Sequence, residues 1–211
     1  MLNKYKTLVF DCDGVVLNSN KVKTEAFYQA ALPYGQPAAQ ALVDFHLERG
    51  GISRYEKFEW FLSTVVPGVE GPDYKTLLKS YAEEVMHGLL RCEVADLALL
   101  RKKNLDANWL IVSGGDQDEL RDIFNKRNLI SFFDGGIFGS PDNKSEILER
   151  EIAAGNINYP ALFLGDSQYD FESAKQAKLD FMFVSGWSEW GNALDSQKFF
   201  TFAVGSLSEC I

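Results

Sequence analysis

Two aspartates stand two residues apart directly after a short apolar run near the start of the sequence. The run Thr7–Phe10 is followed by Asp11, Cys12, Asp13 and Gly14. A near-continuous apolar run is typical of a buried strand, and ligands bind where the strands of an open parallel sheet end. Two carboxylates at such a place are unfavourable unless a cation or a proton compensates them. The pair therefore indicates metal-assisted chemistry.

Further polar groups follow later apolar runs, and the ends of adjacent parallel strands can meet in one pocket. They are Ser113 and Gly114 after the second run, Lys144 after the third, and Asp166 and Asp170 after the fourth. Carboxylates gathered in this way suit Mg²⁺, which prefers a few carboxylates and keeps some of its waters. We therefore expect a magnesium site where these strands end.

The same residues suit phosphoryl transfer. Asp11 could attack phosphorus as a nucleophile. Asp13 could pass a proton to the leaving oxygen and later take one from the hydrolytic water. The Ser113 hydroxyl and nearby amides at a helix start suit a phosphoryl oxygen, and Lys144 supplies the positive charge that a transferring phosphoryl group needs.

Strand and helix patterns alternate from about residue 96 onward. We predict strands at 7–10, 109–112, 136–139, 161–164, 181–184 and 199–204, and helices at 116–126, 144–154 and 170–177. Such alternation indicates the α/β class, with a doubly wound parallel sheet in a Rossmann-like core.

Residues 17–90 break the alternation, because several helical patterns stand between the first and second strands: 21–31, 38–48, 53–64 and 73–89. That is too much for a crossover connection, so we predict an inserted helical cap over the end of the first strand. The core domain would then comprise residues 1–16 and 91–211, and the cap domain residues 17–90. His46 and His87 fall in the cap, where we expect surface or packing residues.

The composition argues against several classes of partner. A formal net charge of -9 disfavours nucleic acid and anionic membranes. The sequence has no signal peptide and no run of eighteen apolar residues, so we expect no membrane span. Cys12, Cys92 and Cys210 show no close pairing, which favours a reducing, cytoplasmic setting. No feature of the sequence indicates an oligomeric state.

Taken together, the motifs resemble those of the haloacid dehalogenase-like superfamily over essentially the whole chain. The matching residues are Asp11-Cys12-Asp13-Gly14-Val15, Ser113, Lys144 and Gly165-Asp166-Ser167-Gln168-Tyr169-Asp170. The resemblance implies that Asp11 forms a phosphoaspartate and that Asp13 is the acid and base. It also implies that phosphate is bound by Ser113, Gly114 and Lys144.

The metal site and the reaction class follow from the same resemblance. It implies Mg²⁺ held by Asp11, the backbone carbonyl of Asp13 and Asp166, with Asp170 supporting the metal or Lys144. Relatives that cleave carbon–halogen or carbon–phosphorus bonds lack the second aspartate. The presence of Asp13 therefore implies a phosphomonoester hydrolase or a phosphotransferase.

Residues 49–54, with the sequence Arg-Gly-Gly-Ile-Ser-Arg, are similar to a substrate-specificity loop. That loop belongs to caps of the phosphoglycolate phosphatase and β-phosphoglucomutase branch, where it reaches the active site on closure. The resemblance implies a substrate-specificity role for Arg49, Gly51 and Arg54, in which either arginine could meet a second anionic group.

We predict a Mg²⁺-dependent phosphatase that hydrolyses a small phosphorylated metabolite, either a sugar phosphate or a phosphorylated acid. One alternative is a sugar-phosphate mutase of the β-phosphoglucomutase type, which passes the phosphate to a second sugar hydroxyl. Another is a regulatory module that binds phosphate without turnover. The filled catalytic positions argue against this second alternative, and release of free phosphate in step with substrate loss would favour hydrolysis over the mutase.

Overall fold

Six parallel strands form one sheet in the computed structural model, which describes residues 2–211 apart from the side chain of Leu194. The strand order is β3-β2-β1-β4-β5-β6, so the chain winds outward from β1 in both directions. The strands are β1 Thr7–Phe10, β2 Asn108–Asp116, β3 Gly136–Ser140, β4 Ala161–Gly165, β5 Asp180–Val184 and β6 Phe202–Val204. This arrangement confirms the predicted α/β class with a doubly wound parallel sheet.

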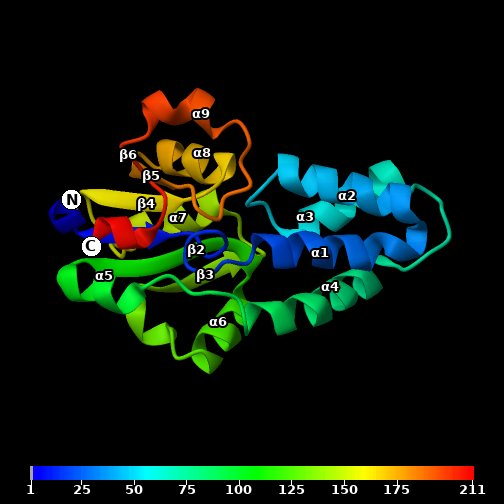
Figure 1. The fold of residues 1–211 in the computed structure, drawn as a ribbon, viewed down its shortest axis with the longest axis horizontal. Helices are drawn as coiled ribbons and strands as arrows, with labels where there is room; N and C mark the ends of the chain where they lie inside the picture. Colours follow the sequence, from blue (N-terminus) through cyan, green and yellow to red (C-terminus); the bar gives the residue numbers. More distant parts are fainter. Residues whose placement is uncertain (1) are drawn as a thin grey trace.

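Side chains of the central strand alternate between two hydrophobic cores, one on each face of the sheet. Leu8 and Phe10 belong to the core covered by α5 and α6, and Val9 belongs to the core under α7, α8 and α9. These helices are α5 Leu97–Lys103, α6 Gln117–Lys126, α7 Lys144–Ala153, α8 Gln168–Gln176 and α9 Ala193–Ser196. Figure 1 shows α5 and α6 below the sheet and α8 and α9 above it. Strand β1 is consequently buried along its whole length.

The carboxyl ends of β1, β2 and β4 lie at one edge of the sheet. Phe10, the last residue of β1, pairs with Ile111 in β2 and with Leu164 in β4. Three helices begin near this edge behind side-chain caps, namely Asp116, Asn143 and Ser167. The topology therefore brings the residues that follow these strands to one place.

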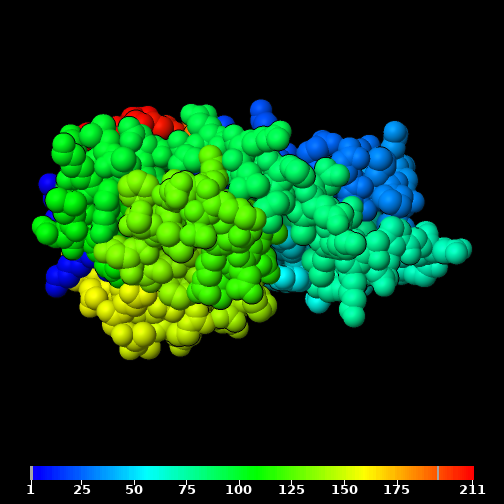
Figure 2. All heavy atoms as spheres, turned by 90° about the horizontal axis from the view of Figure 1, so that it is seen from below, coloured from blue at the N-terminus to red at the C-terminus, as the bar shows by residue number. Residues whose placement is uncertain are grey.

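The cap predicted between β1 and β2 is a bundle of four helices beyond this edge (Figure 1): α1 Asn20–Ala31, α2 Gln36–Glu48, α3 Arg54–Trp60 and α4 Tyr74–Leu89. The ring centroid of Phe27 in α1 lies 5.4 Å from that of Phe58 in α3 and 4.3 Å from that of Tyr81 in α4. Figure 2 shows the bundle as a narrower lobe that extends from the core. The exact division into residues 1–16, 17–90 and 91–211 stays a prediction.

The structure differs from the predicted elements in several places: β2 extends to Asp116, helices α5 and α9 lie outside the predicted elements, and the predicted helix 53–64 and strand 199–204 are shorter. The predicted helix 53–64 ends at Trp60 and continues as a π-helical turn, Phe61–Val65. Helix α5 lies outside the predicted elements, because its 7 residues are too few to show a helical period. The predicted strand 199–204 keeps only its last three residues, because Gln197–Phe199 form a 3₁₀ turn. Within the described residues, no helix is long and apolar enough to cross a bilayer.

Candidate active site

Asp11 lies at the carboxyl end of β1 and is 3 % exposed. Its backbone N–H donates to the Leu164 carbonyl of β4 at 2.9 Å. Lys144 Nζ lies 2.9 Å from Asp11 Oδ1 in an ion pair whose angles do not make a hydrogen bond. Oδ1 therefore has no hydrogen-bond partner among residues 2–211. Burial, followed by the negative charge of Asp170, raises the pKa of Asp11 to about 7.

Asp11 is one of three carboxylates that meet at this edge. One oxygen each from Asp11, Asp166 and Asp170 lie within 4.8 Å of one another. Asp170 is held by protein groups: Oδ1 accepts from Lys144, and Oδ2 accepts from the Ser167 hydroxyl at 2.6 Å and from two backbone amides. Asp170 therefore orients Lys144 and the start of α8, which leaves Asp11 and Asp166 to hold a cation.

Asp166 completes a set of ligands that fits a hard divalent cation. Burial, followed by the charges of Asp170 and Asp11, raises its pKa well above the usual value. A Cβ at Gly14 would lie 2.0 Å from Asp166 Oδ2, and Gly14 has φ +73°, so only glycine lets the turn after Asp13 pass beside this carboxylate. Clustered carboxylates with raised pKa values and an oxygen without a hydrogen bond fit Mg²⁺.

The increase in melting temperature that Mg²⁺ produces is expected to grow as the pH rises from about 6 to about 8. The metal-free folded site binds more protons than the unfolded chain does, because folding raises the pKa of Asp11 to about 7 and that of Asp166 in the same direction. The contribution of the metal-free carboxylates to folding stability therefore falls as the pH rises toward about 7, because they lose their protons. A bound cation compensates the ionised carboxylates and so prevents this loss of stability.

The check is the difference between Tm with Mg²⁺ and Tm with EDTA, measured at each pH. Asp166→Asn should flatten this difference, whereas Asp122→Asn, with a half-exposed side chain on α6, should leave it unchanged. A Mg²⁺ stabilisation of equal size at every pH would contradict the assignment.

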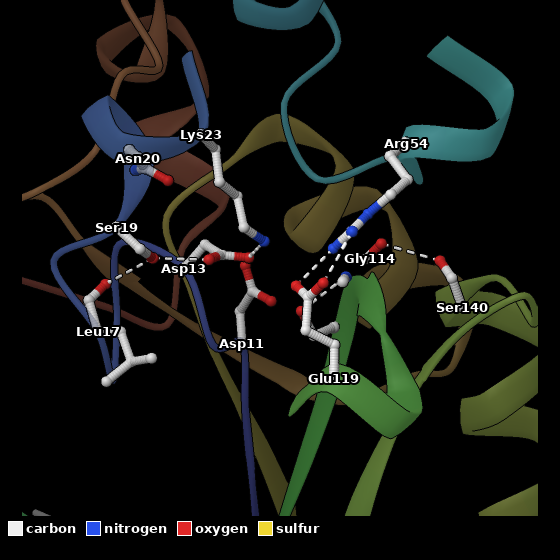
Figure 3. A network of polar contacts seen from close by, with 12 residues as sticks. Asp11, Asp13, Leu17, Ser19, Asn20, Lys23, Arg54, Gly114, Glu119 and Ser140 are labelled. Carbon is white, nitrogen blue, oxygen red and sulfur yellow. Dashed lines mark hydrogen bonds and ion pairs between the residues drawn. The ribbon is translucent and has the colours of Figure 1, made fainter. Parts of the chain in front are cut away.

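Asp13 faces the cap rather than the carboxylate cluster (Figure 3). Its Oδ1 accepts from the Ser19 hydroxyl at 2.6 Å, and its Oδ2 accepts from the Lys23 ammonium of α1. Burial alone would raise the pKa of Asp13, but the charge of Lys23 and the hydrogen bonds of Lys23 and Ser19 outweigh burial and lower it. The lowered pKa favours the ionised form of Asp13 at neutral pH, in which the carboxylate can accept a proton.

The end of β2 places Ser113 behind the pocket and Gly114 in its wall. Ser113 is fully buried, and its hydroxyl accepts from the Gly115 N–H at 3.0 Å. The Gly114 carbonyl accepts from the Ser140 hydroxyl at 2.8 Å (Figure 3). A Cβ at Gly114 would lie 2.0 Å from the carbonyl oxygen of Gly51, so the cap loop and the core backbone are in direct contact here.

The two arginines of the cap loop lie in different places. Arg49 is exposed and does not line the pocket. Arg54 lines the pocket, but its guanidinium donates to both carboxylate oxygens of Glu119 in α6, at 2.9 and 2.6 Å (Figure 3). The neighbouring Tyr55 hydroxyl donates to Asp116 at 2.6 Å. In this structure Arg54 and Tyr55 join the cap to the core.

The pocket is a cavity of about 80 Å³ between the sheet edge and the cap. The carboxylates that line it from the core are Asp11, Asp13, Asp166 and Glu189, and the cap contributes the cations Lys23, Arg54 and Lys57 together with Glu48. The cavity is small, and its walls carry opposite charges. Such a site suits a small polar anion bound together with a metal ion.

Residues 8–184 match the family model described as haloacid dehalogenase-like hydrolase. The match includes the strands that carry the carboxylates and the whole cap. The chain belongs to this family. The family assignment confirms the resemblance drawn from the motifs and makes the protein a hydrolase of haloacid dehalogenase-like type. Among curated proteins, none matches the sequence at a significant level.

Several solved structures share the fold over nearly the whole chain. A predicted phosphoglycolate phosphatase from Haemophilus somnus is 14% identical, with a TM-score of 0.74 over 100% of this chain and 98% of that chain. A predicted phosphatase from Clostridium acetobutylicum is 17% identical, with a TM-score of 0.73 over 98% and 96%. CbbY from Rhodobacter sphaeroides, solved in complex with phosphate, is 15% identical, with a TM-score of 0.69 over 97% and 96%.

Two cap lysines of this haloacid dehalogenase-like hydrolase lie in the pocket but outside the sequence prediction. Lys23 stands four residues before Phe27 on the buried face of α1. Lys57 stands three residues after Arg54 and directly before Phe58 on the buried face of α3. A lysine within the apolar stripe of a helix is the signal that could have found them, because lysine is rarely buried without a partner.

Gly114→Ala is expected to lower hydrolytic activity about 10- to 100-fold, because the new methyl group would push the cap loop away from the core and misplace the groups above the carboxylates. Tm should fall as well, because the new Cβ would overlap the backbone of Gly51 and Ile52, which cannot turn aside as a flexible side chain can. The check is kcat/KM together with Tm. Gly191→Ala is the control, because a Cβ there meets nothing within 4 Å. Equal activity of the two variants would show that this contact is not needed.

Proposed function

We propose that this hydrolase is a Mg²⁺-dependent phosphatase that hydrolyses a phosphomonoester of a small metabolite. The observation that carries the proposal is the pairing of buried Asp11 with Lys144 beside a cavity that Asp13 also lines. A carboxylate nucleophile, a cation fixed against it and a second carboxylate two residues on are the groups that phosphoryl transfer through an aspartate requires.

In the first step, an Asp11 oxygen attacks phosphorus and the bond between phosphorus and the leaving oxygen breaks. Asp13 transfers a proton to that oxygen, so a phosphoaspartate and a free alcohol result. Lys144 compensates the charge of Asp11 and then that of the phosphoryl oxygens. When bound by Asp11, Asp166 and the Asp13 carbonyl, Mg²⁺ supplies further charge neutralisation at the phosphoryl group.

In the second step, water attacks phosphorus, Asp13 takes a proton from that water, and the bond between phosphorus and the Asp11 oxygen breaks. Inorganic phosphate leaves and Asp11 is regenerated. The contact with Lys23 suits this step, since it favours the ionised form of Asp13. In the first step the phosphate ester, itself an anion, competes with Asp13 for Lys23. That competition lets the pKa of Asp13 rise, so that Asp13 can hold the proton it donates.

Ser113, Gly114 and Lys144 are proposed to bind the phosphoryl oxygens. The Ser113 hydroxyl accepts a hydrogen bond from Gly115, which leaves its own hydrogen to be donated. The small cavity favours a small phosphorylated metabolite over a macromolecule. The free thiols of Cys12, Cys92 and Cys210 suit a reducing compartment, so a cytoplasmic location is part of the proposal.

The test is release of inorganic phosphate from a panel of phosphorylated sugars and hydroxy acids, with Mg²⁺ and with EDTA. The proposal expects release from at least one ester, in step with loss of that ester, only with the metal. Loss of a sugar phosphate without free phosphate would instead indicate a mutase. Tight binding of phosphate esters without any turnover would indicate a phosphate-binding module.

A further inference from the structure

The cap cations that line the pocket differ in how their charges are compensated. Lys23 is paired with Asp13, and Arg54 is paired through two hydrogen bonds with Glu119. Lys57 is equally buried, with 2 % exposure, but no carboxylate lies within 4.0 Å of its ammonium among residues 2–211. Among the described residues, Lys57 is therefore the cap cation of the pocket that forms no ion pair, and the nearest influence of carboxylates on it comes from Asp13 and Glu56 beyond ion-pair distance.

The polar contact that Lys57 makes within the described chain is with a histidine. Its Nζ lies 2.7 Å from His46 Nδ1 of α2. When Lys57 is charged it has only donors, so His46 Nδ1 then accepts and Nε2 carries the ring hydrogen. His46 Nε2 is buried and has no partner among residues 2–211. The ring also packs against Phe27, as expected for a packing residue, yet His46 lines the pocket.

Lys57 and His46 thus present hydrogen-bond donors in a buried place where residues 2–211 offer no hydrogen-bond acceptor to match them. Burial, followed by the charge of Lys23, lowers the pKa of Lys57 to about 7. Burial and the charge of Lys57 also lower the pKa of His46 well below its usual value. An anion bound here would raise the pKa of Lys57 again and restore its full positive charge, because an opposite charge stabilises the ammonium.

We propose that Lys57, oriented by His46, binds a carboxylate on the leaving group of the substrate. The inference rests on the proposed phosphatase function and narrows its substrate to a small phosphorylated hydroxy acid. The single positive charge of Lys57 matches the single negative charge of a carboxylate. The cavity of about 80 Å³ also leaves little room for a second phosphate. Arg54 does not take this role, because Glu119 already occupies both ends of its guanidinium.

The test compares two matched pairs of esters, phosphoglycolate with ethyl phosphate and 3-phosphoglycerate with glycerol 3-phosphate. Each pair differs in the carboxylate of the leaving group. In wild type, kcat/KM should favour the acid of at least one pair. In Lys57→Met, KM for that acid should rise about 10- to 100-fold, the loss expected for a charge-assisted hydrogen bond. The values of kcat, and of KM for the matched ester that lacks the carboxylate, should stay near those of wild type.

Lys79→Met is the matched control, because this cap lysine has a side chain that is 76% exposed. His46→Phe should give a smaller rise in KM for the acid, since it removes the group that orients Lys57. A Lys57→Met protein that has a normal Tm and loses activity equally on the acid and on the matched ester without a carboxylate would overturn the proposal. A wild-type enzyme that prefers the ester without a carboxylate, or a bisphosphate, would also overturn it.

Equilibrium binding of the same esters to an Asp11→Asn background, measured by calorimetry, separates the two proposals. If the acid binds more tightly than its counterpart and Lys57→Met abolishes the difference, the Lys57 site stands even where wild type releases no phosphate. In that case it is the phosphatase proposal that fails. If wild type releases phosphate but neither binding nor KM depends on Lys57, the Lys57 site fails and the phosphatase proposal stands.

Discussion

An Asp11→Asn variant is expected to lose at least about 10⁴-fold in kcat on every phosphoester that the wild type cleaves. The amide lacks the negative charge and the lone-pair reactivity with which the carboxylate attacks phosphorus. It also removes a ligand from the carboxylate cluster, so activation by Mg²⁺ should be lost together with turnover. The measurement is steady-state release of phosphate at saturating substrate and metal.

Folding of this variant provides the control within the same experiment. Three carboxylate oxygens within 4.8 Å of one another repel when ionised, so an amide at Asp11 should leave Tm in EDTA unchanged or raise it. Asp122→Asn is the matched substitution at a half-exposed position of α6 and should retain wild-type activity. An Asp11→Asn protein that folds normally and still turns over would remove Asp11 as the nucleophile.

Lys144→Met is expected to cost about 3–5 kcal/mol of folding stability and at least about 10³-fold in kcat/KM. Lys144 is fully buried and pairs with both Asp11 and Asp170. Methionine has a similar volume but leaves these two carboxylates facing each other without a cation. Denaturant unfolding and phosphate release measure the two losses separately.

A double variant distinguishes the structural part of the Lys144 effect from the chemical part. Combining Lys144→Met with Asp170→Asn removes the repulsion and should recover much of the stability while activity stays lost. Lys126→Met is the control, because its pair with Asp122 is half-exposed and is worth about 0.5 kcal/mol at most. If the double variant recovered activity along with stability, Lys144 would be a structural group only.

The core was predictable because its determinants are local or follow from a general rule of parallel sheets. The apolar run of β1 specifies a strand buried on both faces, and the strand order of a doubly wound sheet then brings the ends of β1, β2 and β4 together. Half of the environment of Asp170 is local as well, because the hydrogen bonds of Oδ2 reach back only three and four residues to Ser167 and Asp166, whereas Oδ1 accepts from Lys144, 26 residues away.

The charge distribution of the cap was not predictable, because it depends on contacts between distant parts of the chain. Arg54 and Lys57 stand one helical turn apart on α3, and nothing in their spacing tells which of them finds a carboxylate. Glu119, the partner of Arg54, lies 65 residues away on a helix of the core. Compensation of a buried charge is decided by tertiary packing, whereas sequence spacing reveals only which side chains share a helix face.

The central position of β1 in the sheet has a consequence for how the chain folds during its synthesis. The strand that carries Asp11 is synthesised before both of its neighbours in the sheet, which follow only with Ile111 and Leu164. Until β4 emerges, one edge of β1 remains unpaired and open to wrong partners. Asp166, Asp170 and the loop that fixes Lys144 arrive in the same late stretch. A nascent chain, or one truncated before β4, therefore carries Asp11 without its surroundings, and hydrolytic activity should appear only after β4 and α8 have been synthesised.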